Sequence, residues 1–323
     1  MNFKGIFLAA FYILSFVTIA QNKKVGNTPS DLTERDIVNI LDSIEILIER
    51  NYYNPTKSKF ILTELEEQSS EYLKCSNKDS LAKILSRDLK TFSQDSHMYV
   101  QVLQDEKDRG RDWAAYETEQ EIINNYGFIE MQILPDNIGY LKIIEFMHPK
   151  RSMATAVAAM KMVENTKALI IDLRDNGGGY PGIMEYLIGH YFEGEPELLS
   201  RTELSDGRYT TTHTTDLLMG KLRVNTPLYI LINEHTASAA EYMAYILQAY
   251  NKATIVGEPS AGGANRNEFY SLPNNFRISI SVASPIVIKT NTNWEGVGVI
   301  PDIKTATAKE EALMQIRENH KSE

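Results

Sequence analysis

The sequence predicts an α/β protein with a helical N-terminal part, and three observations support this prediction. Up to about residue 92, apolar side chains recur every three or four positions, as they do on amphipathic helices. Beyond residue 125, short apolar runs alternate with helical segments, which is the order of βα crossovers in a largely parallel sheet. With 43% hydrophobic and 24% charged residues over 323 positions, the composition is that of a globular protein. At roughly 100–200 residues per domain, this length suggests two domains.

The first twenty residues are typical of an export signal. Lys4 precedes an apolar run from Gly5 to Ile19, and Thr18 and Ala20 form a small-residue cleavage site. The run is shorter than the ~20 residues that span a bilayer. We therefore expect the mature chain to begin at Gln21, to be periplasmic or extracellular, and to have no stable membrane span.

The N-terminal part is expected to contain three amphipathic helices. Thr33 and Asp36 have the spacing of a capping box at the start of the first helix, and Asn54-Pro55 breaks that helix. The second helix covers about residues 60–73, and the third contains the apolar positions of 81–89. The simplest interpretation of these apolar stripes is core packing in a small bundle.

The later part alternates between strands and helices. Strands are expected at 138–144, 168–173, 227–232, 269–272 and 277–282, and helices at 154–163, 182–192, 239–250 and from Thr307 onward. The charged residues 104–120 are interpreted as a solvated linker or lid. The predicted organisation is therefore a signal peptide at 1–20, a helical subdomain with its linker at 21–115, a core at 116–306 and a C-terminal helix or tail at 307–323.

Charge and cysteine content exclude several classes of function. The net charge of −10 and the absence of a basic run argue against a nucleic-acid partner. Cys75 is the single cysteine, so the chain has neither an internal disulfide framework nor a cysteine-based metal cluster. No ligand cluster suggests a metal, and no organic cofactor is required. The oligomeric state is not predicted.

A glycine loop follows the buried run that ends near Asp172. Gly177, Gly179 and Gly182 fit the GxGxxG pattern of dinucleotide binding. Against that interpretation, five residues separate Ile171 from the first glycine, and no second strand ends in an acidic residue at the required distance. The loop equally fits a plain tight turn, or a set of backbone N–H groups that stabilise an oxyanion.

Two further segments carry a serine and a histidine. Ser238 lies among small residues between a buried run and a helical run, where it is either a nucleophile or a simple helix cap. His97 closes the sequence Asp95-Ser-His, where it is either a base or a structural side chain. His235 competes as the base because it lies near Ser238 in sequence. Being on the same turn, it is less suited to point across at the hydroxyl.

Together these segments resemble the C-terminal processing (tail-specific) serine peptidases, whose relatives include the tricorn protease core and the interphotoreceptor retinoid-binding modules. The resemblance covers most of the mature chain, and the ordered set of motifs is far more specific than any one motif. The matching motifs are Asn51-Tyr-Tyr-Asn54, Asp95-Ser-His97, Ile138-Gly-Tyr140, Leu169 to Gly179, Leu231 to Glu241, Val256 to Gly263 and Glu295 to Ile303.

The family has two catalytic solutions. Many members pair the serine with a lysine in the glycine-rich segment after the serine helix, but here that segment ends in Gly262-Gly263. Arg266 stays protonated and cannot act as a base, and Lys252 and Lys289 lie outside the segment. The tricorn-like branch uses serine and histidine, supported by a glutamate and a second serine. The resemblance thus implies Ser238 as nucleophile, His97 as general base, Glu295 and Ser96 as supporting residues, and the N–H groups of Ala239 and of Gly178 or Gly179 as oxyanion donors.

The resemblance also implies an architecture and a function. Only 40 residues lie between His97 and Ile138, too few for the PDZ domain that many relatives insert there. The implied fold is a crotonase-like ββα core with an N-terminal helical subdomain, and the active site lies where they meet. We expect an exported serine endopeptidase that cleaves proteins or peptides. The alternative is a catalytically inactive module that binds an apolar ligand or a polypeptide; a dinucleotide oxidoreductase ranks third.

Overall fold

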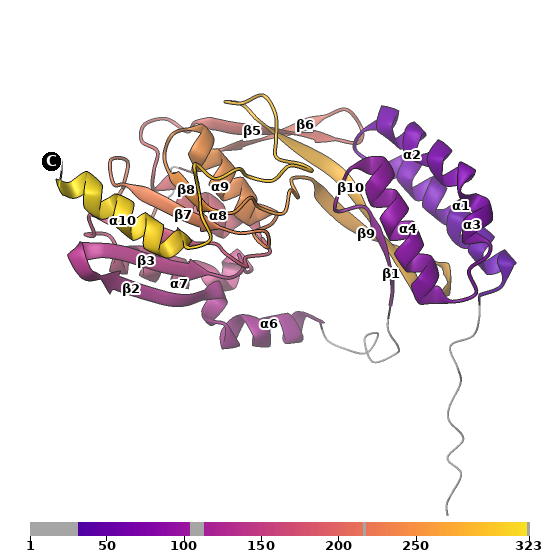
Figure 1. Ribbon diagram of the computed structural model, residues 1–323, viewed down its shortest axis with the longest axis horizontal. Helices are drawn as coiled ribbons and strands as arrows, with labels where there is room; N and C mark the ends of the chain where they lie inside the picture. Colours follow the sequence, from indigo (N-terminus) through magenta and orange to yellow (C-terminus); the bar gives the residue numbers. More distant parts are fainter. Residues whose placement is uncertain (1–31, 104–112, 216–217, 322–323) are drawn as a thin grey trace, which may run out of the picture. The chain divides into compact units, whose positions relative to one another are not determined.

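A computed structural model describes residues 32–103, 113–215 and 218–321 (Figure 1). The predicted export signal at 1–20 and residues 104–112 of the predicted linker lie outside the described residues. In the described ranges, no helix is long and apolar enough to cross a membrane. Helices and strands form a mixed α/β fold, as the sequence predicted.

The N-terminal helices begin and end at local signals. α1 (Glu34–Asn51) starts with the predicted capping box, in which Thr33 and Asp36 exchange hydrogen bonds. α2 (Pro55–Glu67) begins at the proline, five residues earlier than expected from the apolar pattern. Asn54 caps it by accepting from the Lys57 N–H at 3.0 Å. A short helix α3 (Ser69–Tyr72) and the long α4 (Lys78–Ser93) complete the group.

A five-stranded antiparallel sheet connects these helices with the rest of the fold. Its central strand is β10 (Phe276–Val287), which pairs with β9 (Arg266–Leu272), with β1 (Tyr99–Val102) and, further along, with β5 (Leu198–Leu204); β6 (Tyr209–His213) extends β5. The first half of β10 packs into the same hydrophobic cluster as α1, α2 and α4, whereas its last residue, Val287, packs into the main core. One strand therefore belongs to both cores.

The second sheet has six strands and is parallel except at one edge, which confirms the predicted parallel sheet. The strand order is β11 (Ile303–Lys304), β8 (Thr254–Gly257), β7 (Leu228–Ile232), β4 (Ala168–Asp172), β3 (Ile138–Ile143) and β2 (Phe128–Leu134). β4 and β7 are buried at every position, as expected for strands covered on both faces.

Helices cover both faces of this sheet (Figure 1). One face packs against α7 (Pro149–Met162), α8 (Pro181–Gly189) and α9 (Ala239–Ala249), and the other against α10 (Ala308–Lys321). α6 (Trp113–Ile123) is joined to the start of α7 by Glu121, whose carboxylate accepts from the His148 N–H at 3.1 Å and pairs with Arg151. Because β4 and β7 are neighbouring parallel strands, the loops that follow them begin at the same edge of the sheet.

Candidate active site

Ser238 occupies a strained turn between β7 and α9. Its φ of 54° and ψ of −120° are unusual for a residue with a side chain, and such strain is concentrated at functional sites. The Ser238 N–H donates to Glu241 Oε2 at 2.8 Å. The side chain is half-buried at the N-terminus of an 11-residue helix. The turn thus places the hydroxyl beside the positive end of a helix dipole.

The glycine loop after β4 lies directly against this serine. A Cβ atom at Gly178 would lie 2.7 Å from the Ser238 Cβ and 3.0 Å from the Ala239 nitrogen. The Gly178 N–H already donates to Asn176 Oδ1 at 2.8 Å. Gly179 forms a β-bridge with Phe146. In this bridge the Phe146 N–H donates to the Gly178 carbonyl and the Tyr180 N–H donates to the Phe146 carbonyl, so the Gly179 N–H takes no part. Of the two glycines considered as oxyanion donors, Gly178 therefore has an N–H that already has a partner, whereas no partner of the Gly179 N–H is found in the described chain.

Glu241 connects the serine turn to the loop after β8. This carboxylate is fully buried and accepts four hydrogen bonds. The donors are the backbone N–H of Ser238 at 2.8 Å, the Ser260 hydroxyl at 2.6 Å, and the backbone N–H groups of Gly262 at 2.6 Å and Gly263 at 2.9 Å. Glu241 thus fixes Ser238 relative to the glycine-rich segment.

His97 reaches the same segment from the opposite direction. A Cβ atom built on Gly263 would lie 2.9 Å from His97 Cε1, 3.3 Å from Nε2 and 3.5 Å from Glu241 Oε2. Gly263 therefore separates the imidazole from the carboxylate that binds the Ser238 N–H. In the described chain no direct hydrogen bond joins His97 to the Ser238 hydroxyl. Catalytic hydrogen bonds are often long or poorly aligned in structures without substrate, and they tighten only when the substrate binds.

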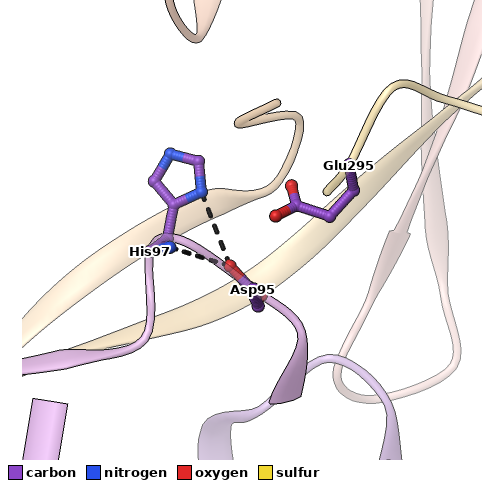
Figure 2. A group of neighbouring side chains, drawn as sticks. All are labelled: Asp95, His97 and Glu295. Atoms are coloured by element: carbon purple, nitrogen blue, oxygen red, sulfur yellow. Dashed lines mark hydrogen bonds and ion pairs between the residues drawn. The ribbon is translucent and has the colours of Figure 1, made fainter. Parts of the chain in front are cut away.

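Asp95 and Glu295 lie beside the imidazole (Figure 2). Asp95 Oδ1 accepts from the His97 backbone N–H at 2.9 Å and lies 3.6 Å from Nδ1. Asp95 Oδ2 accepts from Asn265 Nδ2 at 2.8 Å. Asp95 is 2% exposed, so these contacts are made away from bulk water.

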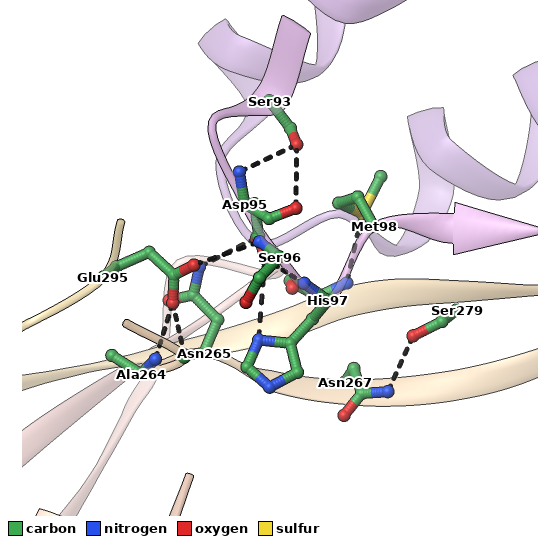
Figure 3. A network of polar contacts seen from close by, with 12 residues as sticks. Ser93, Asp95, Ser96, His97, Met98, Ala264, Asn265, Asn267, Ser279 and Glu295 are labelled. Carbon is green, nitrogen blue, oxygen red and sulfur yellow. Dashed lines mark hydrogen bonds and ion pairs between the residues drawn. The ribbon is translucent and has the colours of Figure 1, made fainter. Parts of the chain in front are cut away.

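Glu295 binds backbone groups of two loops (Figure 3). Its Oε2 accepts from the N–H groups of Ala264 at 2.7 Å and Asn265 at 2.9 Å, and its Oε1 accepts from the Ser96 N–H at 3.4 Å. Ser96 and Glu295, 199 residues apart in sequence, are therefore brought together. The contact that joins them is made by the Ser96 backbone N–H.

Comparison with known proteins identifies the family. Residues 137–305 match the model of peptidase family S41, and residues 32–135 match the N-terminal domain of Peptidase_S41 in eukaryotic IRBP. The chain belongs to peptidase family S41. The predicted resemblance to C-terminal processing peptidases is thereby confirmed, and neither matching model is a PDZ domain.

Curated relatives of this S41 chain are processing proteases. It is 28% identical over 176 residues to the carboxy-terminal-processing protease of Bartonella bacilliformis, covering 52% of this chain and 38% of that protein. It is 27% identical over 166 residues to carboxyl-terminal-processing peptidase 2, chloroplastic, of Arabidopsis thaliana, covering 51% and 31%. The chain thus spans about a third of the length of these relatives.

A solved structure supports the fold of the S41 chain over most of its length. A putative peptidase from Parabacteroides merdae superposes with a TM-score of 0.61 at 21% identity, covering 88% of this chain and 93% of that one. The predicted α/β peptidase fold with an N-terminal helical part is confirmed.

Burial and neighbouring charges shift the pKa values of the S41 site. Burial lowers the pKa of His97, but the carboxylates of Asp95, Glu295 and Glu241 outweigh it and raise that pKa above its ordinary value. Burial, together with the nearby Asp95 charge, raises the pKa of Glu295 to about 7. Burial raises the pKa of Asp95, but hydrogen bonds, that of His97 first, outweigh burial and lower it. At neutral pH Asp95 is therefore the ionised carboxylate of the pair, and Glu295 is close to its midpoint.

Asp95, His97 and Glu295 also offer three ligand atoms within 4.8 Å of one another, the spacing of a candidate metal site. Both oxygens of each carboxylate already accept hydrogen bonds, from Asn265 and from the backbone of the two loops. This arrangement is that of a polar network, which needs no metal ion to satisfy its acceptors.

The competing bases lie elsewhere. His235 is exposed, and its Nε2 lies 3.6 Å from Glu234 Oε1. Lys252 and Lys289 lie over the rings of Phe192 and Tyr250, at 5.3 Å and 5.9 Å from the ring centres. Each of these three side chains therefore has a neighbour other than the loop of Gly263.

Sequence reasoning missed three residues of the network, namely Asp95 as a separate participant, Glu241 and Asn265. Asp95 had a local signal, because an aspartate side chain commonly accepts from the backbone N–H of the residue two positions later. Glu241 stood in the capping-box position three residues after Ser238. Asn265 had no signal, since its partner Asp95 lies 170 residues away in sequence.

Proposed function

We propose that this chain is an exported serine endopeptidase that hydrolyses proteins or peptides, with Ser238 as nucleophile and His97 as general base. The observation that carries the proposal is the strained Ser238 turn, packed against Gly178 and connected through Glu241 to the glycine that contacts His97. A serine that only caps a helix has no need of positive φ or of a glycine loop packed on its Cβ.

Each group then has a chemical role. His97 Nε2 accepts the Ser238 proton as Oγ attacks the scissile carbonyl carbon. The oxyanion is stabilised by the N–H groups of Ala239 and Gly179 at the start of α9 and in the glycine loop. His97 then donates that proton to the leaving amine, and water, activated in the same way, hydrolyses the acyl-enzyme. Glu295 holds the loops of Ser96 and Asn265 together around the base.

The names of the curated relatives support a polypeptide substrate, since both are carboxyl-terminal-processing enzymes. The charge of −10 gives no basis for a nucleic-acid partner. The signal-like residues 1–20 support export to a periplasmic or extracellular location.

The nucleophile is tested with a fluorophosphonate probe and mass-spectrometric mapping of the labelled residue. We expect the label on Ser238, and we expect Ser238→Ala to lose both labelling and peptide hydrolysis. Circular dichroism of the variant should match the wild type, because a half-buried hydroxyl contributes little to the fold. Labelling that persists in Ser238→Ala would contradict the assignment.

A second candidate function rests on residues 32–135, which match a domain described in eukaryotic IRBP. It favours a binding module of the same fold for an apolar ligand or a polypeptide. An unlabelled Ser238 together with saturable binding of an apolar fluorophore would support that candidate instead.

A further inference from the structure

The described part of the chain buries three aspartates, and one of them lacks an arginine partner. Asp88 and Asp172 each form an ion pair with a neighbouring arginine, at 2.7 Å and 2.6 Å. Asp95 is equally buried, at 2% exposure, but the only ion pair it forms among the described residues is with His97. A buried carboxylate needs hydrogen-bond donors or a paired cation to offset its desolvation. Among the described residues, His97 is the one cationic group placed to pair with Asp95.

The contacts of Asp95 fix the base on two sides. Oδ1 accepts from the His97 backbone N–H at 2.9 Å and faces Nδ1 at 3.6 Å, while Oδ2 is fixed by Asn265 Nδ2 at 2.8 Å. His97 Nδ1 is itself buried and has no hydrogen-bond partner among the described residues. A closure of less than one ångström would complete the hydrogen bond from Nδ1–H to Asp95.

Glu295 is arranged for a different task. Its two oxygens accept from the backbone N–H groups of Ser96, Ala264 and Asn265, so it joins two loops. It makes no hydrogen bond to the imidazole in the described chain. The carboxylate that faces Nδ1 within ion-pair distance is that of Asp95.

We infer that Asp95, held by Asn265, is the positioning residue of the base: it keeps the His97 proton on Nδ1 and leaves Nε2 free to accept the Ser238 proton. The inference rests on the proposed function, and it assigns to Asp95 the orienting role that the family resemblance implies for Glu295 and Ser96. The same carboxylate stabilises the imidazolium that forms as Ser238 attacks.

The first test uses the wild-type protein and needs no substrate. Nitrogen-15 NMR of histidine-labelled protein, with the His97 signals assigned by their loss in His97→Gln, reports which ring nitrogen carries the proton of the neutral ring. We expect the proton on Nδ1. A neutral His97 protonated on Nε2 would overturn the inference even in a protein whose substrate is unknown.

The second test is the isosteric Asp95→Asn. Its amide donates to Nδ1 and so moves the ring proton to Nε2, and we expect kcat to fall on the order of 10³–10⁴-fold with KM changed only a few-fold. The apparent pKa of His97 should also move down, because the variant lacks the charge that favours the imidazolium.

Two matched variants separate positioning from folding. Asp88→Asn removes another buried carboxylate, which contacts Arg87 and Tyr72, and should lower the melting temperature without changing kcat or the His97 tautomer. Glu295→Gln should leave the proton on Nδ1. A wild-type kcat in Asp95→Asn would overturn the inference. A change of tautomer in Glu295→Gln alone would assign the positioning role to Glu295. If no peptide is hydrolysed by the wild type, the proposed function fails, while the tautomer measurement still decides the role of Asp95.

Discussion

At the scale of single residues, the site depends on the absence of one side chain. In the Ser–Lys members that this sequence resembles, a lysine stands in the glycine-rich segment after the serine helix, whereas here the segment ends in two glycines. The hydrogen-bonded path from Ser238 through Glu241 reaches Gly263, and the His97 ring packs on that glycine from the other side. The imidazole and a side chain at position 263 therefore compete for the same space.

We predict that Gly263→Ala displaces His97. The new Cβ would lie 2.9 Å from Cε1, closer than side-chain carbons approach ring atoms, so the ring must move. We expect turnover to fall at least about 10²-fold, the lower range of a lost general base, with little change in melting temperature. Gly177→Ala is the control, because its Cβ would meet nothing within 4 Å. Equal turnover in both variants would show that His97 does not need this space.

The raised pKa of Glu295 predicts a pH dependence of stability. Its pKa is about 7 in the folded state and 4.5 in the reference state, so between these values the folded chain binds more protons than the unfolded chain. Stability therefore falls as pH rises through this window. We will compare the free energy of unfolding at pH 5 and at pH 8, each measured by urea titration. Between these two pH values we expect it to fall less in Glu295→Gln than in the wild type. Parallel decreases would show that Glu295 titrates normally.

At the scale of elements, the sequence predicted best where the signal is local. Asn54-Pro55 ended the first helix, and the alternation of buried strands with helices predicted the parallel sheet. β5 and β6 were not predicted, because their side chains are mostly polar and half-exposed and show no apolar pattern. Ser238 and His97 were proposed as site residues from local motifs. Asn265 was not, since only the pairing of distant loops brings it to Asp95.

The prediction at this scale concerns Glu241, at the N-terminus of α9. Glu241 receives four hydrogen bonds in a fully buried position, so Glu241→Ala leaves several donors unsatisfied. At about 1–3 kcal/mol for each unsatisfied group, we expect the free energy of unfolding to fall by about 3 kcal/mol or more. Chemical denaturation measures it, with the exposed Glu234→Ala as control, for which we expect less than about 0.5 kcal/mol. A loss as small as that of the control would mean that Glu241 is not needed to hold the loop.

At the scale of the whole chain, the site is assembled from segments that are far apart in sequence. His97 and Asp95 follow α4, which packs in the cluster of the N-terminal helices, whereas Ser238 begins α9 in the main core. β10 contributes to both clusters. Because the proposed base and the proposed nucleophile come from different cores joined by one strand, we expect the active arrangement to require both cores to be folded.

This dependence leads to a prediction about α1, which contributes no group to the site. Ile44 is 1% exposed in the N-terminal cluster, and Ile44→Ala should lower the free energy of unfolding by about 2–5 kcal/mol. Ile46, on the same helix but 46% exposed, supplies the matched control, with an expected change within about 0.5 kcal/mol. In urea, fluorophosphonate labelling of Ser238 and far-UV circular dichroism should be lost at one midpoint, and Ile44→Ala should move both midpoints together. Labelling at an undiminished rate after the helical signal has fallen would show that the main core keeps a reactive serine without its N-terminal partner, and His97 would then not be the base.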